Sequence, residues 1–354
     1  MIGSAVTIPS SPLDTDPNNL PFLHGGPLGS AKFKAEPEDF VVEEVLGFEP
    51  SGDGEHCLVW VEKRDVDSND AGARLADAVG IRRRLVSHCG LKDRHAVTRQ
   101  WFSLHLPGQE SPNAAALESE GLRVLRVTRN LRKLRRGTHV GNRFTIRLRD
   151  PDFDGEKAAT RWRAIEERGA PNFFGHQRFG IGGRNIEKAM AMFRGDFVPR
   201  DRLLRGILIS AARSFLFNAV VAARIADGTW DSPMPGEVYG FPDNRSLILP
   251  ERQRGDELSR FESGTLEITA PLYGQGESQS VEQLREVEQQ LLESYSEVKT
   301  GLDSFGLKQE RRVMRVRPMN SHMEVLTNGD IQLSFELPKG TYATALLREM
   351  LHLS

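Results

Sequence analysis

The alternation of apolar and polar residues predicts β-strands near both ends of the chain. Residues 39–45 and 57–62 are rich in Val, Leu and Trp and are separated by a Gly-rich turn, so we expect them to form a hairpin. Near the C-terminus, residues 323–326 and 331–337 flank Asn328-Gly329, a dipeptide that strongly favours a tight turn between paired strands. A second hairpin is therefore predicted there.

Between these strands the apolar residues recur with helical spacing. Helices are predicted at about residues 70–79, 156–168, 184–194, 203–226 and 281–298. The second ends at Gly169 with Pro171 just beyond it, which indicates a domain boundary. The last opens with Ser280 and Gln283 at capping-box spacing. The order of strands, helices and strands indicates that the final strands rejoin the first sheet and that the helical block is an insertion.

The segment 203–226 is the most apolar in the chain, but Arg205, Arg213 and Arg224 interrupt it, so it predicts a buried or amphipathic helix rather than a membrane span. The N-terminal residues mix Ser, Pro, Asp and Asn and lack the basic and apolar regions of a secretory signal, so we expect a flexible tail over residues 1–25. Two cysteines are too few for a disulfide framework. A cytoplasmic protein is predicted, and with no oligomer signal we expect a monomer.

Basic residues are concentrated between Gly121 and Arg149, although the formal net charge of the chain is only −2. This stretch holds ten basic residues and no acid, namely Arg123, Arg126, Arg129, Arg132, Lys133, Arg135, Arg136, Arg143, Arg147 and Arg149. Residues 143–148 alternate strictly, which predicts a half-buried strand with a cationic outward face. We predict a surface that binds nucleic-acid phosphates, and a solvated run of charge is the alternative.

The segment 90–100 places one carboxylate, Asp93, among basic residues in a loop between two short apolar runs. Such surroundings would keep the carboxylate ionised. A structural ion pair is the alternative interpretation. In an extended loop Lys92 and Arg94 would point to the side opposite Asp93, so neither is a good candidate for its partner.

Five motifs in this chain resemble those of the TruD family of tRNA pseudouridine synthases, and they occur in the family's order. They are FKAEPEDF (33–40), GLKDRHAVTRQ (90–100), GNRF (141–144), PNFFGHQRFG (171–180) and LPKGTYAT (337–344). The resemblance implies an α+β fold, with a mixed, mainly antiparallel catalytic sheet formed by residues 26–167 and 317–354. It also implies that a largely helical TRUD domain is inserted at residues 168–316.

The resemblance further implies the isomerisation of uridine 13 of tRNA to pseudouridine, with Asp93 as the catalytic carboxylate and Lys34 as its basic partner. By the same resemblance, Phe40, Asn142 and Tyr342 contact the substrate, although the family often has Phe where this chain has Tyr342. The reaction breaks the C1′–N1 bond and joins C1′ to C5, so it needs neither a cofactor nor a metal. Asp93 either attacks C1′ or removes a proton from C2′.

Other interpretations of these residues are open. Without the resemblance Lys34 is an ordinary surface lysine, Phe40 a core residue and Asn142 a turn residue. Phe144 lies on the apolar face of its strand, so we predict that it packs in the core.

Further alternatives concern other chemistry. His88, Cys89 and His95 are close in sequence but lack the usual spacing of metal ligands. Gly180, Gly182 and Gly183 form either a phosphate-approaching turn or a plain helix start, and the helix start is favoured. At the level of function, a non-catalytic RNA-binding protein or RNA chaperone is the main alternative. A glycoside hydrolase would need a second carboxylate near Asp93.

Overall fold

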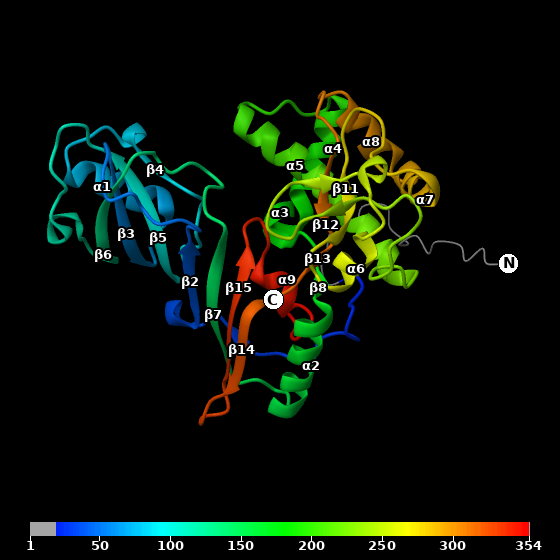
Figure 1. Ribbon diagram of the computed structural model, residues 1–354, viewed down its shortest axis with the longest axis horizontal. Helices are drawn as coiled ribbons and strands as arrows, with labels where there is room; N and C mark the ends of the chain where they lie inside the picture. The colour runs from blue at the N-terminus through cyan, green and yellow to red at the C-terminus, as the bar shows by residue number, and fades with distance from the viewer. Residues whose placement is uncertain (1–18, 354) are drawn as a thin grey trace. The chain divides into compact units, whose positions relative to one another are not determined.

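The computed structural model describes residues 19–353, which fall into two compact units (Figure 1). One unit, here called the sheet unit, comprises residues 28–166, 318–343 and 353. The other, the helical unit, comprises residues 19–27, 167–317 and 344–352. Of the predicted tail, residues 1–18 lie outside the described residues, whereas the backbone N–H groups of Leu23 and His24 donate to the carboxylate of Glu349.

The sheet unit is built on one mixed sheet. Its strands are β1 (Lys32–Phe33), β2 (Phe40–Val45), β3 (His56–Arg64), β4 (Val86–His88), β5 (Val97–His105), β6 (Leu122–Asn130), β7 (Gly141–Arg149), β14 (Met319–Val325) and β15 (Ile331–Pro338). The main order is β14-β15-β7-β2-β5-β3-β6, with β1 paired to β7 and β4 to β5. β2 and β5 run parallel, and the other pairs described in this sheet are antiparallel. The predicted α+β fold is confirmed.

One of the two predicted hairpins forms and the other does not. β14 and β15 pair across the Asn328-Gly329 turn, and β15 also pairs along β7, so the final strands do rejoin the first sheet. In contrast, β5 lies between β2 and β3, so the predicted hairpin of these two strands is wrong. The reason is that β5 is buried along most of its length and takes a central position with a partner on each edge.

Two helices, α1 (Ser68–Ala78) and α2 (Gly155–Arg168), pack against the sheet. Asp67 caps α1 by accepting from the backbone N–H groups of Asn69 and Asp70. The apolar stripe of α1 joins a core with residues of β3, β5 and β6. On α2, Trp162 lies with its ring 5.4 Å from that of Phe335 on β15.

The helical unit surrounds one long buried helix, α5 (Arg202–Ala226), capped by Asp201. α5 is long and apolar enough to cross a membrane, but 72% of its most apolar window is buried inside the protein. The other helices are α3 (His176–Phe179), α4 (Arg184–Arg194), α6 (Glu257–Glu262), α7 (Glu282–Glu293), α8 (Ser296–Asp303) and α9 (Ala343–Leu347). The strands are β8 (Ala170–Pro171), β9 (Tyr239–Gly240), β10 (Leu247–Ile248), β11 (Glu267–Leu272), β12 (Glu310–Val313) and β13 (Arg315–Val316).

The single helix predicted over residues 281–298 is instead two helices, α7 and α8. Tyr295, between them, has non-helical backbone angles, and its buried ring packs edge-on against Phe215 of α5, 5.2 Å away. The predicted capping box is also absent, since Val281 is the N-cap and the Ser280 hydroxyl donates to Glu288. Tertiary packing of the aromatic ring therefore overrides the helical periodicity.

Candidate active site

Asp93 lies in the loop between β4 and β5, here called the Asp93 loop (residues 89–96). Its carboxylate accepts a hydrogen bond from the Lys34 ammonium at 2.8 Å, and the two side chains are 34% and 27% exposed. Lys34 follows β1 and has a φ of +56°, in the left-handed region that non-glycine residues rarely adopt. Asp39 stabilises this turn by accepting from the Glu36 backbone N–H and pairing with Arg149. A strained backbone therefore presents the lysine to Asp93.

The Lys34 ammonium also lies over the Phe40 ring, 3.9 Å from its centroid. Phe40 is only 4% exposed and packs edge-on against Phe33, with ring centroids 5.5 Å apart. In this structure Phe40 is thus a core residue that supports Lys34, and its ring would meet a substrate only if Lys34 moved aside. Phe144, 6.0 Å from Phe40 and stacked on Phe335, is buried as predicted.

Asn142 lies on the same face of the sheet, since its register partner on β2 is Glu44 and Phe144 follows two residues later on β7. Its side-chain Oδ1 is buried and accepts no hydrogen bond from any residue in the described part of the chain. A buried acceptor without a hydrogen bond raises the free energy of the folded state. Tyr342 is half-exposed and lies just beyond β15, the strand that pairs with β7.

The other cations of the segment 90–100 are held away from Asp93. Lys92 pairs with Glu44 at 3.0 Å, the Arg94 guanidinium donates to the Asp65 carbonyl, and Arg99 pairs with Glu62. The expectation that Lys92 and Arg94 point away from Asp93 is confirmed. The structure therefore gives Asp93 a cation from a distant segment, Lys34, rather than one from its own loop.

The strand at residues 143–148 is half-buried with Arg143 and Arg147 outward, as predicted, but this face is not cationic, because sheet pairing places acids beside both arginines. A row of alternating charges crosses five neighbouring strands, formed by Glu62, Arg99, Glu43, Arg143 and Glu336. Arg147 pairs with Asp330, and Arg149 with Asp39. The cationic face is neutralised by residues that are distant in sequence.

Four exposed cations of the basic stretch lie together in one loop. Arg132, Lys133, Arg135 and Arg136 lie between β6 and β7 in what we call the basic loop (residues 131–140), and within residues 19–353 none of them pairs with an acid. The basic loop contacts the Asp93 loop, since the Gly137 N–H donates to the Cys89 carbonyl at 2.8 Å. A polyanion bound to the basic loop would therefore lie beside the Asp93 loop.

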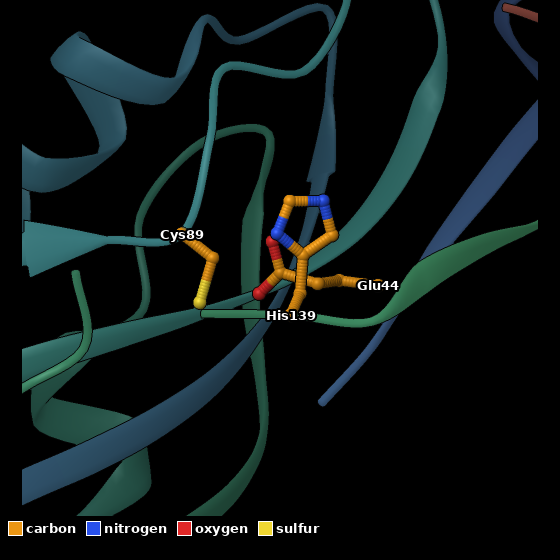
Figure 2. Close-up of side chains that lie close together, drawn as sticks. All are labelled: Glu44, Cys89 and His139. Atoms are coloured by element: carbon orange, nitrogen blue, oxygen red, sulfur yellow. The ribbon is translucent and has the colours of Figure 1, made fainter. Parts of the chain in front are cut away.

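The candidate metal ligands of the sequence, His88, Cys89 and His95, do not form a common site among the described residues. The His95 side chain is exposed and faces Asp65, whereas Cys89 is buried. A different group forms instead, in which Glu44, Cys89 and His139 point toward one another (Figure 2). The glycines at 180–183 lead directly into α4, which confirms the plain helix start.

Two buried charged residues near the site were not predicted, Glu44 and Lys63. Both are almost fully buried, and burial lowers the pKa of Lys63 to about 8. The Lys63 ammonium donates to the Val66 carbonyl at 2.9 Å. The sequence did carry a signal for Glu44, because the alternation of its strand puts it on the inward face with Phe40 and Val42.

Comparison with known proteins defines first the fold and then the family. The crystal structure of a putative tRNA pseudouridine synthase D from Methanosarcina mazei matches with a TM-score of 0.70 and 21% identity, covering 97% of this chain and 96% of that one. This likeness establishes the fold.

The family assignment rests on sequence. The family model for tRNA pseudouridine synthase D (TruD) matches residues 23–198 and 193–350. The tRNA pseudouridine synthase D of Chromohalobacter salexigens is 41% identical over 337 residues, 95% of this chain and 97% of that protein. The Aeromonas salmonicida protein of the same name is 43% identical over 334 residues, 94% of each chain. The chain therefore belongs to the TruD family of tRNA pseudouridine synthases, as its motifs predicted.

Proposed function

We propose that this protein isomerises uridine 13 of tRNA to pseudouridine, with Asp93 as the catalytic carboxylate. Membership of the TruD family supports the reaction class, and the Lys34–Asp93 pair is the observation that carries the assignment to particular residues. The two residues are 59 positions apart in sequence, yet the fold joins them at 2.8 Å with the carboxylate partly open to solvent.

The proposed chemistry uses the residues of the sheet unit alone. The C1′–N1 bond breaks, the detached uracil turns, and C5 bonds to C1′ while the C5 proton leaves to solvent and N1 gains a proton. Asp93 either attacks C1′ and is displaced when C5 bonds to C1′, or removes a proton from C2′ that is returned when C5 adds. Lys34 holds the carboxylate through its hydrogen bond. Nothing is oxidised and no group is donated, so we propose that no cofactor or metal takes part.

The substrate contacts are proposed on the same grounds. The free Oδ1 of Asn142 accepts from the base edge, and the Tyr342 ring contacts the turned-out nucleotide. Phe40 takes part through Lys34, which lies on its ring. We also propose that residues 168–316 form the inserted TRUD domain and that the protein acts as a cytoplasmic monomer.

Mapping of the product tests this proposal directly. Purified protein is incubated with a tRNA transcript, and pseudouridines are located by mass spectrometry of nuclease fragments. We expect one pseudouridine at position 13, and none when cytidine replaces uridine 13. A pseudouridine elsewhere in the same transcript would refute the site, and no pseudouridine at all would favour the non-catalytic RNA-binding alternative.

A further inference from the structure

Glu44, Cys89 and His139 meet in the interior of the sheet unit (Figure 2), and Cys89 is the first residue of the Asp93 loop. Their candidate ligand atoms all lie within 4.8 Å of one another, and all three residues are buried. The residue types alone would suit a transition metal such as zinc. The cluster therefore needs an explanation, since the proposed chemistry does not use it.

The Lys92 ammonium already balances the negative charge of Glu44 in this cluster. The Lys92 ammonium lies 3.0 Å from Oε2 of Glu44, with the two side chains 6% and 0% exposed, and Oε1 of Glu44 accepts from the Trp101 N–H. Burial and the neighbouring Glu44 raise the pKa of the Cys89 thiol to about 12, so it stays protonated. A metal ion would have to displace Lys92 and deprotonate Cys89, which favours an ion pair over a metal centre.

The backbone around Lys92 is fixed as firmly as its side chain. The Lys92 N–H donates to the Ser68 hydroxyl at 2.9 Å, and this hydroxyl donates to the Gln100 side chain at 2.8 Å. The same Gln100 side chain donates to the Gly90 carbonyl at 2.6 Å. These bonds, with the Lys92–Glu44 pair, hold the chain on the N-terminal side of Asp93 at three points.

We propose that the buried Lys92–Glu44 pair is a positioning device that aims the Asp93 carboxylate at the substrate. This inference rests on the proposed catalytic role of Asp93. Successive side chains of an extended segment point to opposite sides, so anchoring Lys92 in the interior turns Asp93 outward toward Lys34. A displacement of about 1 Å at a reacting group can lower a rate by roughly 100-fold, so a fixed anchor has a large effect on turnover.

Three variants separate positioning from simple stability, namely Lys92→Met, Glu44→Gln and the double variant. Each single change leaves one buried group without its partner, so both should lower the melting temperature. The loss should be roughly 5–10 °C for Lys92→Met, because this change leaves the buried Glu44 carboxylate without a cation. The double variant strands no charge and should recover most of that loss. We expect kcat to fall by about 10- to 100-fold in all three, with KM for tRNA within about twofold of the wild type.

Hydrogen exchange of the folded protein provides a second measurement. Peptides covering residues 89–95 should exchange faster in the double variant, while the exchange of β3 peptides should not change.

Arg147→Met is the control for a general loss of stability, because it removes the cation paired with Asp330 on the other face of the same sheet. It should lower the melting temperature and leave kcat unchanged.

Two outcomes would overturn the proposal. One is a double variant with wild-type kcat. The other is one equivalent of zinc in the purified protein that is lost in Cys89→Ser. If Asp93→Asn were fully active, the proposed function itself would fail, whereas an inactive Asp93→Asn with a fully active double variant would refute only the positioning role.

Discussion

At the scale of single residues, the sequence placed Asp93 in a polar loop but could not supply its surroundings. Lys34 was assigned to it by family resemblance, and the structure shows the physical basis, a left-handed turn and a supporting aromatic ring. The partners of Lys92 and Arg94, the other cations near Asp93, could not be predicted from the sequence. Glu44 and Asp65 lie 48 and 29 residues away from Lys92 and Arg94, and local patterns do not report such contacts.

His139 provides a prediction at this scale. Burial, with smaller contributions from Lys92 and Lys339, lowers the pKa of its imidazole to about 4. Between about pH 6.5 and pH 4 the unfolded chain protonates this histidine and the folded chain does not, so the free energy of unfolding should decrease as pH falls through this window. The full effect is roughly 3 kcal/mol, since one pKa unit is worth about 1.4 kcal/mol.

Urea denaturation at a series of pH values measures this effect. His139→Asn should show a shallower loss of stability between pH 6.5 and pH 4 than the wild type. Parallel curves for the two proteins would show that His139 does not contribute to the acid sensitivity.

At the scale of elements, strands with clear alternation and a strong turn were predicted well. β7, β14 and β15 occur where the sequence indicates, and the Asn328-Gly329 hairpin forms. The failures were tertiary in origin. Nothing local to β2 and β3 reveals that β5 comes between them, and the break between α7 and α8 depends on the packing of Tyr295 against Phe215.

Aromatic rings of β7, β15 and α2 pack together in the core of the sheet unit, which leads to a stability prediction. Phe335 is 1% exposed and lies between Phe144 and Trp162. Phe335→Ala should lower the free energy of unfolding by about 3–5 kcal/mol. Phe48→Ala, at a phenylalanine that is 39% exposed in the same unit, should cost less than about 1 kcal/mol. Equal losses in urea denaturation would contradict this account of the core.

At the scale of the whole molecule, the sequence overstated the phosphate-binding surface. Residues 121–149 contain ten cations and no acid. In the folded protein, however, acids from other segments pair with Arg143, Arg147 and Arg149. Only the arrangement of the folded chain distinguishes these paired arginines from the exposed cations of the basic loop.

This distinction predicts how tRNA binding depends on salt. Each phosphate contact contributes about 0.7–0.9 to the slope of log K against log salt concentration. Replacement of Arg132, Lys133, Arg135 and Arg136 by Gln should therefore flatten the slope by up to about 3. Arg143→Gln, at an arginine already paired with Glu336, should leave the slope unchanged. If instead the fourfold variant kept the wild-type slope, the RNA would have to bind elsewhere.

The central claim is that the carboxylate of Asp93 performs the isomerisation, and tritium release from tRNA labelled at uridine C5 tests it most directly. In single-turnover reactions Asp93→Asn should release tritium at least about 100-fold more slowly than the wild type while still binding tRNA. Asp77→Asn, the same change at an exposed acid of α1 that pairs with Arg83, should react normally. Release by Asp93→Asn at the wild-type rate would contradict the account.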